Sequence, residues 1–285
     1  MKTKNFKTLI TRSAILFISL FALTFFQSGN VFAATPPWST TFNCADWQQN
    51  NSLSCDTIGN YGGWTCDATH NDQITTAANN PAGAGGKGFR HWKGPGLNQN
   101  GGSIRFTTPT MPEFWMRFYM KIPTTFDIGT NQFQDKAFYI NHLDAAGIYF
   151  GFRNGSAEDN FNFVPNSLGQ NNFVNYGTGF LGVNGGRTGD GQWHSYEVHL
   201  KKDTNGSNGV IELWIDGVSG GSRTNVNLNG VNHSGWNDFL VGENQSANAS
   251  SGCQPIDFDD VAISTTGYIG PLSGGTPDTT PPSIP

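Results

Sequence analysis

Hydrophobic and polar residues alternate with a period of two through much of the second half of the chain. In the clearest case, between residues 190 and 218, one set of alternate positions is apolar: Tyr196, Val198 and Leu200, then Ile211, Leu213 and Ile215. Period-two alternation is typical of a strand with one buried face. Residues 203–209 between the two stretches are rich in Asn and Gly, which accept turn conformations. The segment therefore predicts two antiparallel strands joined by a turn, with a second turn at Asp216-Gly217.

Strand-like segments follow one another from residue 103 onward, and we find no convincing amphipathic helix. The segments are 103–109, 114–122, 136–143, 147–153, 161–164, 238–243 and 255–264. The 37 glycines suit a chain dense in turns, and the 22 phenylalanines suit an aromatic core. The predicted fold class is all-β, a jelly-roll β-sandwich of two antiparallel sheets.

The first 33 residues have the pattern of a signal peptide. Four basic residues precede an apolar run over residues 14–26, and Ala33 closes a segment suited to cleavage. The run is too short for a comfortable membrane span. We expect cleavage after Ala33, one domain over residues 34–272, and a Pro/Thr/Gly-rich linker or tail over residues 273–285. The corresponding prediction is a secreted protein, extracellular or periplasmic, with no membrane association after cleavage.

Removing the leader makes the chain more acidic. The whole sequence has a formal net charge of −5; without the four basic leader residues, 12 basic residues remain against 21 acidic ones, a formal charge of −9. Such a chain does not attract nucleic acid or anionic membrane overall. Seven of the 12 basic residues lie between Lys87 and Lys136, which predicts a local positive face.

The even number of cysteines, in an exported chain, indicates two disulfides. They are Cys44, Cys55, Cys66 and Cys253. Three pairings are open. A metal-thiolate site is disfavoured because the sequence has no CxxC pair.

Two of these patterns resemble a known superfamily. The 190–218 hairpin resembles the late strands of the concanavalin A-like jelly roll, which is shared by secreted lectins, laminin G-like domains and polysaccharide lyases. The order of strand 114–122, its following Phe-Asp turn and the segment 134–140 is similar to lyases of the alginate and glucuronan lyase type. The resemblance implies that Lys136 matches the lysine of the lyase motif and that Arg117 and Tyr119 match cleft residues. The flanks of Lys136 depart from that motif, because neither its Gly pair nor its Pro-Gly is present.

Strand 114–122 carries an aromatic and cationic row on one face: Trp115, Arg117, Tyr119 and Lys121. Aromatic rings stack on sugar rings, and Arg and Lys hold hydroxyls or carboxylates, so the row predicts a sugar-binding groove. The alternative is a solvated outer face with snorkelling side chains.

A lyase acting on a uronic acid must neutralise the carboxylate, remove the neighbouring proton and protonate the leaving oxygen. Arg117 or Lys136 suits the first task. His142, Tyr149 or Tyr119 suits the other two. Further predicted substrate-binding residues are Arg153, which shares a face with Tyr149, and His91 and Trp92, at a cleft edge.

The other histidines divide differently. His194 is predicted to be buried and hydrogen-bonded, and His199 and His233 to lie on the surface. Hydrolysis by paired acids is disfavoured, because no Glu-x-Asp-x-x-Glu strand is present.

The late acidic strand predicts a structural calcium. Asp259 or Asp260, with oxygens from residues 43–46, would provide the carboxylate and carbonyl ligands that calcium prefers. The alternative is a solvated acidic strand end.

We therefore expect a monomeric secreted protein that engages a polysaccharide. Two functions remain open: a polysaccharide lyase, and a non-catalytic glycan-binding module of a larger secreted protein. A laminin G-like adhesion domain with a protein partner is a third possibility.

Overall fold

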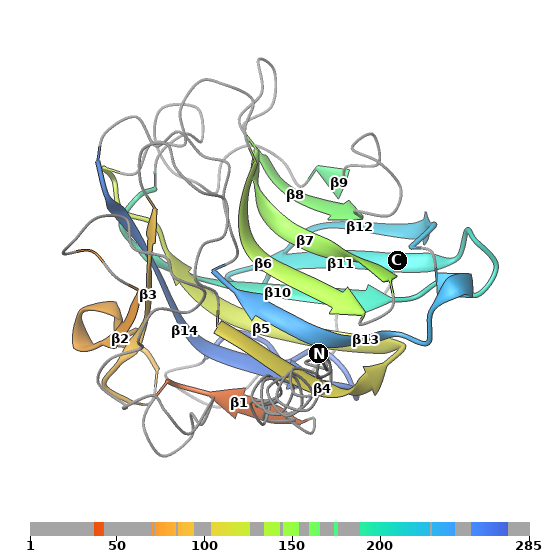
Figure 1. Cartoon of the computed structure of the whole chain (residues 1–285), viewed down its shortest axis with the longest axis horizontal. Helices are drawn as coiled ribbons and strands as arrows, with labels where there is room; N and C mark the ends of the chain where they lie inside the picture. The colour runs from red at the N-terminus through yellow and green to blue at the C-terminus, as the bar shows by residue number, and fades with distance from the viewer. Residues whose placement is uncertain are drawn as a thin grey trace, which may run out of the picture. The chain divides into compact units, whose positions relative to one another are not determined.

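We describe a computed structural model of the chain (Figure 1). It describes residues 37–42, 70, 72–83, 85–93, 104–125, 134–142, 145–153, 160–165, 174–175, 189–228, 230–242 and 252–272. Residues Phe32–Pro285 form one compact unit. The predicted leader, the predicted tail and three of the four cysteines lie outside the described residues.

Two antiparallel sheets make up the unit (Figure 1). In the eight-stranded sheet the order is β12–β11–β10–β5–β14–β3–β2, and β1 also pairs with β14. Its strands are β1 (Trp38–Thr40), β2 (Gln73–Thr75), β3 (Gly88–Lys93), β5 (Glu113–Lys121), β10 (Trp193–Lys201), β11 (Gly209–Ile215), β12 (Val218–Val226) and β14 (Gln254–Ser264). A short 3₁₀ turn, η1 (Thr76–Ala78), follows β2, and another, η3 (Gly230–Asn232), follows β12.

The six-stranded sheet has the order β4–β13–β6–β7–β8–β9. Its strands are β4 (Ile104–Met111), β6 (Gln134–His142), β7 (Ala145–Arg153), β8 (Asn160–Pro165), β9 (Val174–Asn175) and β13 (Trp236–Val241). β6, β7 and β8 run side by side and bend together (Figure 1). The prediction of an all-β fold of two antiparallel sheets is confirmed.

The core lies between the sheets and is aromatic, as the composition predicts. The centroid of the Phe118 ring in β5 lies 4.2 Å from that of Phe138 in β6, 5.7 Å from that of Phe150 in β7, and 5.4 Å from that of Tyr196 in β10. All four side chains are at most 1% exposed. Since residues at alternate positions point to opposite faces, this contact fixes the inner and outer face of each strand.

The predicted hairpin is present as β10 and β11, paired from Tyr196–Ile215 to Lys201–Val210. The predicted second turn joins β11 to β12 through Asp216 and Gly217, whose φ values are 50° and 77°. Two left-handed residues are what a two-residue hairpin turn requires, and Asp-Gly accepts them at low cost.

β14 bends at a bulge between Asp259 and Ala262, where Asp260 has a φ of 49°. Its first half pairs with β3 and its second half with β1, while β5 follows it on the other side. β3 and β1 therefore lie on the same side of β14, one before and one after the bulge. Among the described residues, no helix is long and apolar enough to cross a membrane.

Candidate functional site

The outer face of the six-stranded sheet brings together several of the predicted catalytic residues. Tyr149 in β7 is the register partner of Tyr139 in β6. Their neighbours along the strands, Ile140 and Phe150, are buried in the core, so positions 139 and 149 lie on the opposite face. Tyr139 is partly exposed, which makes this part of the face accessible.

Lys136 joins this face through a bulge. The register between β6 and β7 shifts between Lys136 and Phe138, and Lys136 pairs with Gly151. β7 itself continues without a shift against β8, so Gly151 and Arg153 share the face of Tyr149. Positions 136, 149 and 153 thus lie on one face, next to Gly151.

Sequence reasoning missed the polar residues that complete the face. Tyr139 follows the core residue Phe138 in the strand alternation, and this was the signal that could have found it. Asn162 in β8 is the register partner of Gly151 on one side and of Asn175 on the other, which only the strand order reveals. Amides and phenols beside cations are suited to sugar hydroxyls and carboxylates. His142 ends β6 opposite Ala145, at the turn into β7.

Arg117 and Tyr119 do not belong to this face. They lie on the outer face of the eight-stranded sheet, on the opposite side of the sandwich, beneath residues 268–272, which we call the C-terminal strap. Arg117 Nη1 donates to the carbonyl of Gly270 (3.0 Å), and the Tyr119 hydroxyl accepts from the N–H of Leu272 (2.6 Å). Arg117 is 8% exposed and Tyr119 is 6% exposed. The prediction that both line a cleft with Lys136 is wrong, because the strand pattern could not reveal that the chain's own strap covers them.

Glu197, which sequence reasoning did not single out, fastens the same strap. Its carboxylate accepts from the N–H of Ile269 (2.6 Å) and of Gly270 (2.7 Å). Burial raises the pKa of Glu197 to about 7, although the two N–H groups and Arg117 act in the opposite direction. Burial likewise lowers the pKa of Arg117 and raises that of Tyr119.

The ends of the predicted aromatic and cationic row also have partners within the chain. Trp115 stacks on the ring of His199, with centroids 4.1 Å apart and planes 3° apart. Lys121 Nζ lies 3.6 Å from Asp257 and 5.3 Å from the centre of the Trp193 ring. The row forms one outer face as predicted, but its side chains contact the sheet and the strap, and Arg117 also borders a hollow beside the strap.

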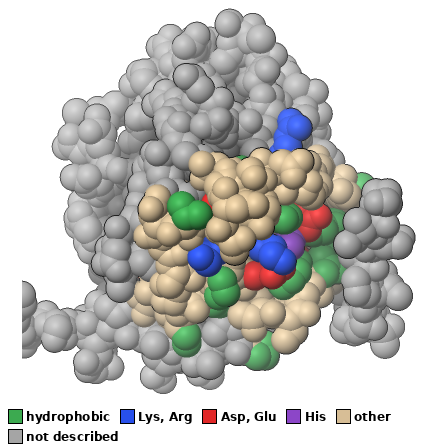
Figure 2. Space-filling model, turned by 90° about the vertical axis from the view of Figure 1, so that its right-hand side faces the viewer, with side chains coloured by type: hydrophobic (Ala, Val, Ile, Leu, Met, Phe, Trp, Pro, Cys, Tyr) green, Lys and Arg blue, Asp and Glu red, His purple; other side chains and the backbone are tan. Residues whose placement is uncertain are grey.

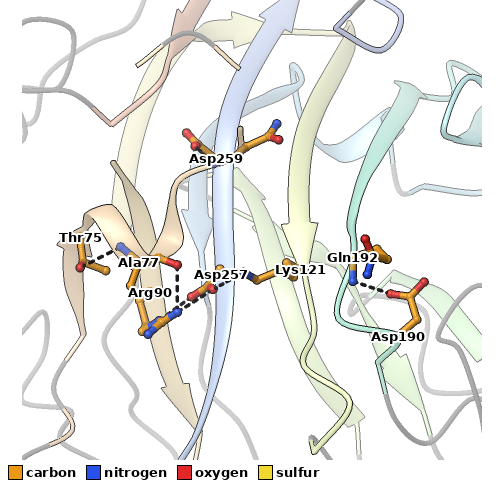
Figure 3. Close-up of polar contacts among 9 residues, drawn as sticks. Thr75, Ala77, Arg90, Lys121, Asp190, Gln192, Asp257 and Asp259 are labelled. Atoms are coloured by element: carbon orange, nitrogen blue, oxygen red, sulfur yellow. Dashed lines mark hydrogen bonds and ion pairs between the residues drawn. The ribbon is translucent and has the colours of Figure 1, made fainter. Parts of the chain in front are cut away.

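The predicted positive face is partly neutralised on this sheet. Arg90 forms a bidentate ion pair with Asp257, in which Nε donates to Oδ1 (2.7 Å) and Nη2 donates to Oδ2 (2.9 Å). Asp257 also faces Lys121 (Figure 3). Arg90 also donates to the carbonyl of Ala77 (3.1 Å). Figure 2 shows the side of the molecule that lies at the right in Figure 1. There, basic, acidic and apolar side chains of the described residues are interspersed in small groups.

His91 and Trp92 do not line the face of the six-stranded sheet either. His91 is 1% exposed and its Nδ1 lies 2.6 Å from Asp72, which also accepts from the N–H of Trp92 (2.9 Å). Trp92 lies on β3 with its ring edge against His70, 4.3 Å between centroids. The buried His91–Asp72 pair is structural, so the prediction of a sugar contact for His91 is wrong.

The other histidines do not lie at the depths that the sequence predicts. His194 lies between Asp216 (2.6 Å) and Asp190 (2.9 Å), which confirms its predicted hydrogen bonding, but it is part-buried, not buried as predicted. His199 is 7% exposed, held by Glu212 and Glu113, and His233 is 9% exposed. The prediction that His199 and His233 lie on the surface is wrong, because both pack against tryptophan rings.

The two predicted calcium ligands are buried side by side. Asp259 is 2% exposed and accepts from the N–H groups of Asn80 and Asp260, both at 2.8 Å. Asp260 is 3% exposed and accepts from Asn80 Nδ2 (2.8 Å). Gly83 packs so closely that a Cβ there would lie 2.1 Å from Asp260 Oδ2. The described residues contain no group of three or more ligating side chains, and the predicted oxygens of residues 43–46 lie outside them.

Cys253, just before β14, is disulfide-bonded. The three early cysteines lie outside the described residues, so the three pairings stay open and the prediction of two disulfides stays a prediction.

No protein-family model matches the chain, and no curated protein matches it. Solved structures do. The alginate lyase Aly36B aligns over 82% of this chain and 98% of its own, with 13% identity and a TM-score of 0.54. The fold is a concanavalin A-like jelly roll. A double mutant of that lyase, in complex with an alginate tetrasaccharide, aligns over 81% and 98%, with 12% identity and a TM-score of 0.50. The cellulose-induced protein Cip1 aligns over 82% and 99%, with 18% identity and a TM-score of 0.47. At these identities the likeness shows the fold alone.

Proposed function

We propose that the protein is a secreted polysaccharide lyase that cleaves a uronic acid-containing glycan on the outer face of the six-stranded sheet. The observation that supports this is the register of β6 and β7, which gathers Lys136, Tyr139, Tyr149 and Arg153 on one face. A mutant of the alginate lyase Aly36B, which has a similar fold, has a solved structure in complex with an alginate tetrasaccharide.

The reaction is a β-elimination, in which no atom is oxidised or reduced. A base removes the proton from the carbon beside the uronate carboxylate, the electron pair becomes a carbon–carbon double bond, and the bond to the glycosidic oxygen breaks. Lys136 and Arg153 neutralise the carboxylate, because a cation there stabilises the charge that develops as the proton leaves. Tyr149 and Tyr139 act as base and acid, and His142 at the end of β6 is the alternative base.

A second candidate is a non-catalytic glycan-binding module. The observation that favours it is the engagement of Arg117 and Tyr119 by the C-terminal strap, which removes from the face two residues that the lyase resemblance would supply. The remaining Tyr, Asn, Lys and Arg positions still suit a bound acidic sugar chain.

One experiment distinguishes the two. The mature protein is incubated with alginate, glucuronan, pectate, heparin and neutral glucans, and the ultraviolet absorbance of the unsaturated uronate is followed. We expect a rise on one polyuronate that is lost in Lys136→Ala and in Tyr149→Phe. Lys201→Ala, half-exposed at the far sheet, is the matched control and should keep full activity. No rise on any polymer, with retention of the protein on one of them, would refute the lyase and support the binding module.

We also propose that Asp259 and Asp260 hold a structural calcium. Two adjacent buried carboxylates favour a cation close by, since their mutual repulsion and desolvation are costly. The ion would brace the bend in β14 and would take no part in the reaction.

A further inference from the structure

A hollow opens on the outer face of the eight-stranded sheet, beside the C-terminal strap. Its volume is about 530 Å³, within the range of small-ligand sites. One cross-strand row explains its position: Ser39 in β1 pairs with Ala262 in β14, and Ala262 pairs with Arg117 in β5. The strap covers the continuation of the row over Glu197 and Trp214 but leaves the end at Ser39 uncovered. Ala262, the smallest side chain of the row, forms the floor.

The side chains that line the hollow are of the kinds that bind an acidic sugar. Arg117 borders it, and of its three guanidinium nitrogens only Nη1 makes a hydrogen bond within the described residues, to Gly270. Its Nε is buried and has no partner there. The hydroxyls of Ser264 and Thr266, 3.2 Å apart, and the ring of Tyr268 complete the rim.

We infer that this hollow is a second binding site, for the carboxylate of a uronic acid residue. A guanidinium held under a strap is pre-organised, because its position is fixed before a ligand arrives. Its Nη1 and Nη2 keep N–H groups for a carboxylate, which would add a counter-charge to those of Glu197 and Asp260 around a cation that is 92% removed from water. The hydroxyls of Ser264 and Thr266 form hydrogen bonds with the hydroxyls of the sugar, and the ring of Tyr268 packs against the sugar ring. The site lies on the opposite outer face from Lys136 and does not depend on the proposed lyase activity.

Calorimetric titration of the mature protein with a uronate trisaccharide tests the site. Thr266→Trp fills the rim without touching Arg117. Thr265→Trp is the matched control, since Thr265 is the exposed neighbour that does not border the hollow. Ala262→Leu fills the floor independently. We expect Thr266→Trp and Ala262→Leu to weaken binding at this site at least about tenfold, because a filled hollow keeps the sugar carboxylate from its charge-assisted contact with Arg117, and Thr265→Trp to leave it unchanged.

The stoichiometry separates this site from the proposed catalytic face. If both exist, wild type binds two trisaccharides, and Lys136→Ala and Thr266→Trp each remove a different one. If only the hollow binds, wild type takes one, which Thr266→Trp removes and Lys136→Ala does not. Equal binding by Thr266→Trp and Thr265→Trp, or equal binding of a neutral glucose trisaccharide, would overturn the inference.

Discussion

His194 links the start of β10 to the turn after β11 and makes the stability of the fold depend on pH. Its ring lies 2.6 Å from Asp216 and 2.9 Å from Asp190. The bond to Asp216 raises the pKa of His194 from 6.5 to about 9, against the effect of burial, and Asp190 acts in the same direction. A pKa that is higher in the folded state means that the folded protein holds this proton more tightly than the unfolded chain. The stabilisation is therefore complete below about pH 6.5 and is lost as the pH rises through about 9.

The rise in the pKa of His194 corresponds to about 3 kcal/mol, at ~1.4 kcal/mol per pH unit, before screening by solvent. His194 is 22% exposed and its partners are 36% and 49% exposed, so we expect about 1–2 kcal/mol to remain.

The assay is the free energy of unfolding in urea, measured at about pH 6 and about pH 10 for wild type and His194→Gln. Other groups titrate in this range, so the decisive quantity is the difference between the two proteins. We expect His194→Gln to be less stable than wild type at the lower pH and nearly equal to it at the higher pH. A difference that is the same at both pH values would refute the reasoning, because the substitution would then act through packing alone.

Three further predictions follow from burial and charge. Because burial raises the pKa of Glu197 from 4.5 to about 7, stability should fall by up to about 3 kcal/mol as the pH rises through this range, and Glu197→Gln should flatten that part of the urea-unfolding profile. Phe118→Ala should cost about 3–5 kcal/mol in the same assay, since it removes a ring from the centre of the core, whereas Val218→Ala, 64% exposed, should cost under about 0.5 kcal/mol. Removing calcium with EDTA should lower the Tm, and adding calcium back should restore it; a Tm that does not respond, in wild type and in Asp259→Asn alike, would argue against the ion.

The strand pattern alone was enough to predict the fold class, because alternation reports which residues share a buried face. The hairpin 190–218 and its Asp216-Gly217 turn were predicted to within a residue or two for the same reason. Tyr149 and Arg153 were likewise placed on one face, since alternation holds along an unbroken strand. These are local properties, and the sequence carries them directly.

Two features of the candidate site are not local and could not be predicted. β5 and β6 are consecutive in the chain but belong to different sheets, so Arg117 and Lys136 lie on opposite outer faces. The bulge before Phe138 brings Lys136 onto the face of Gly151, and no residue in this segment predicts a bulge. The alternation of polar and apolar residues on an outer face is also the same whether solvent, a ligand or the chain's own strap covers that face.

The position of Arg117 bears on how any activity measurement should be interpreted. Its guanidinium, the Tyr119 hydroxyl and the Glu197 carboxylate together hold residues 269–272 against the sheet. Replacing Arg117 would release a strap contact and uncover part of the face, so a loss of activity in such a variant would not by itself identify a catalytic group. Lys136 lies in β6, in the other sheet from the strap, so its replacement leaves the strap contacts in place. Activity lost at unchanged stability in Lys136→Ala is therefore evidence about catalysis, whereas the same loss in an Arg117 variant becomes evidence only when its stability has been shown to be unchanged.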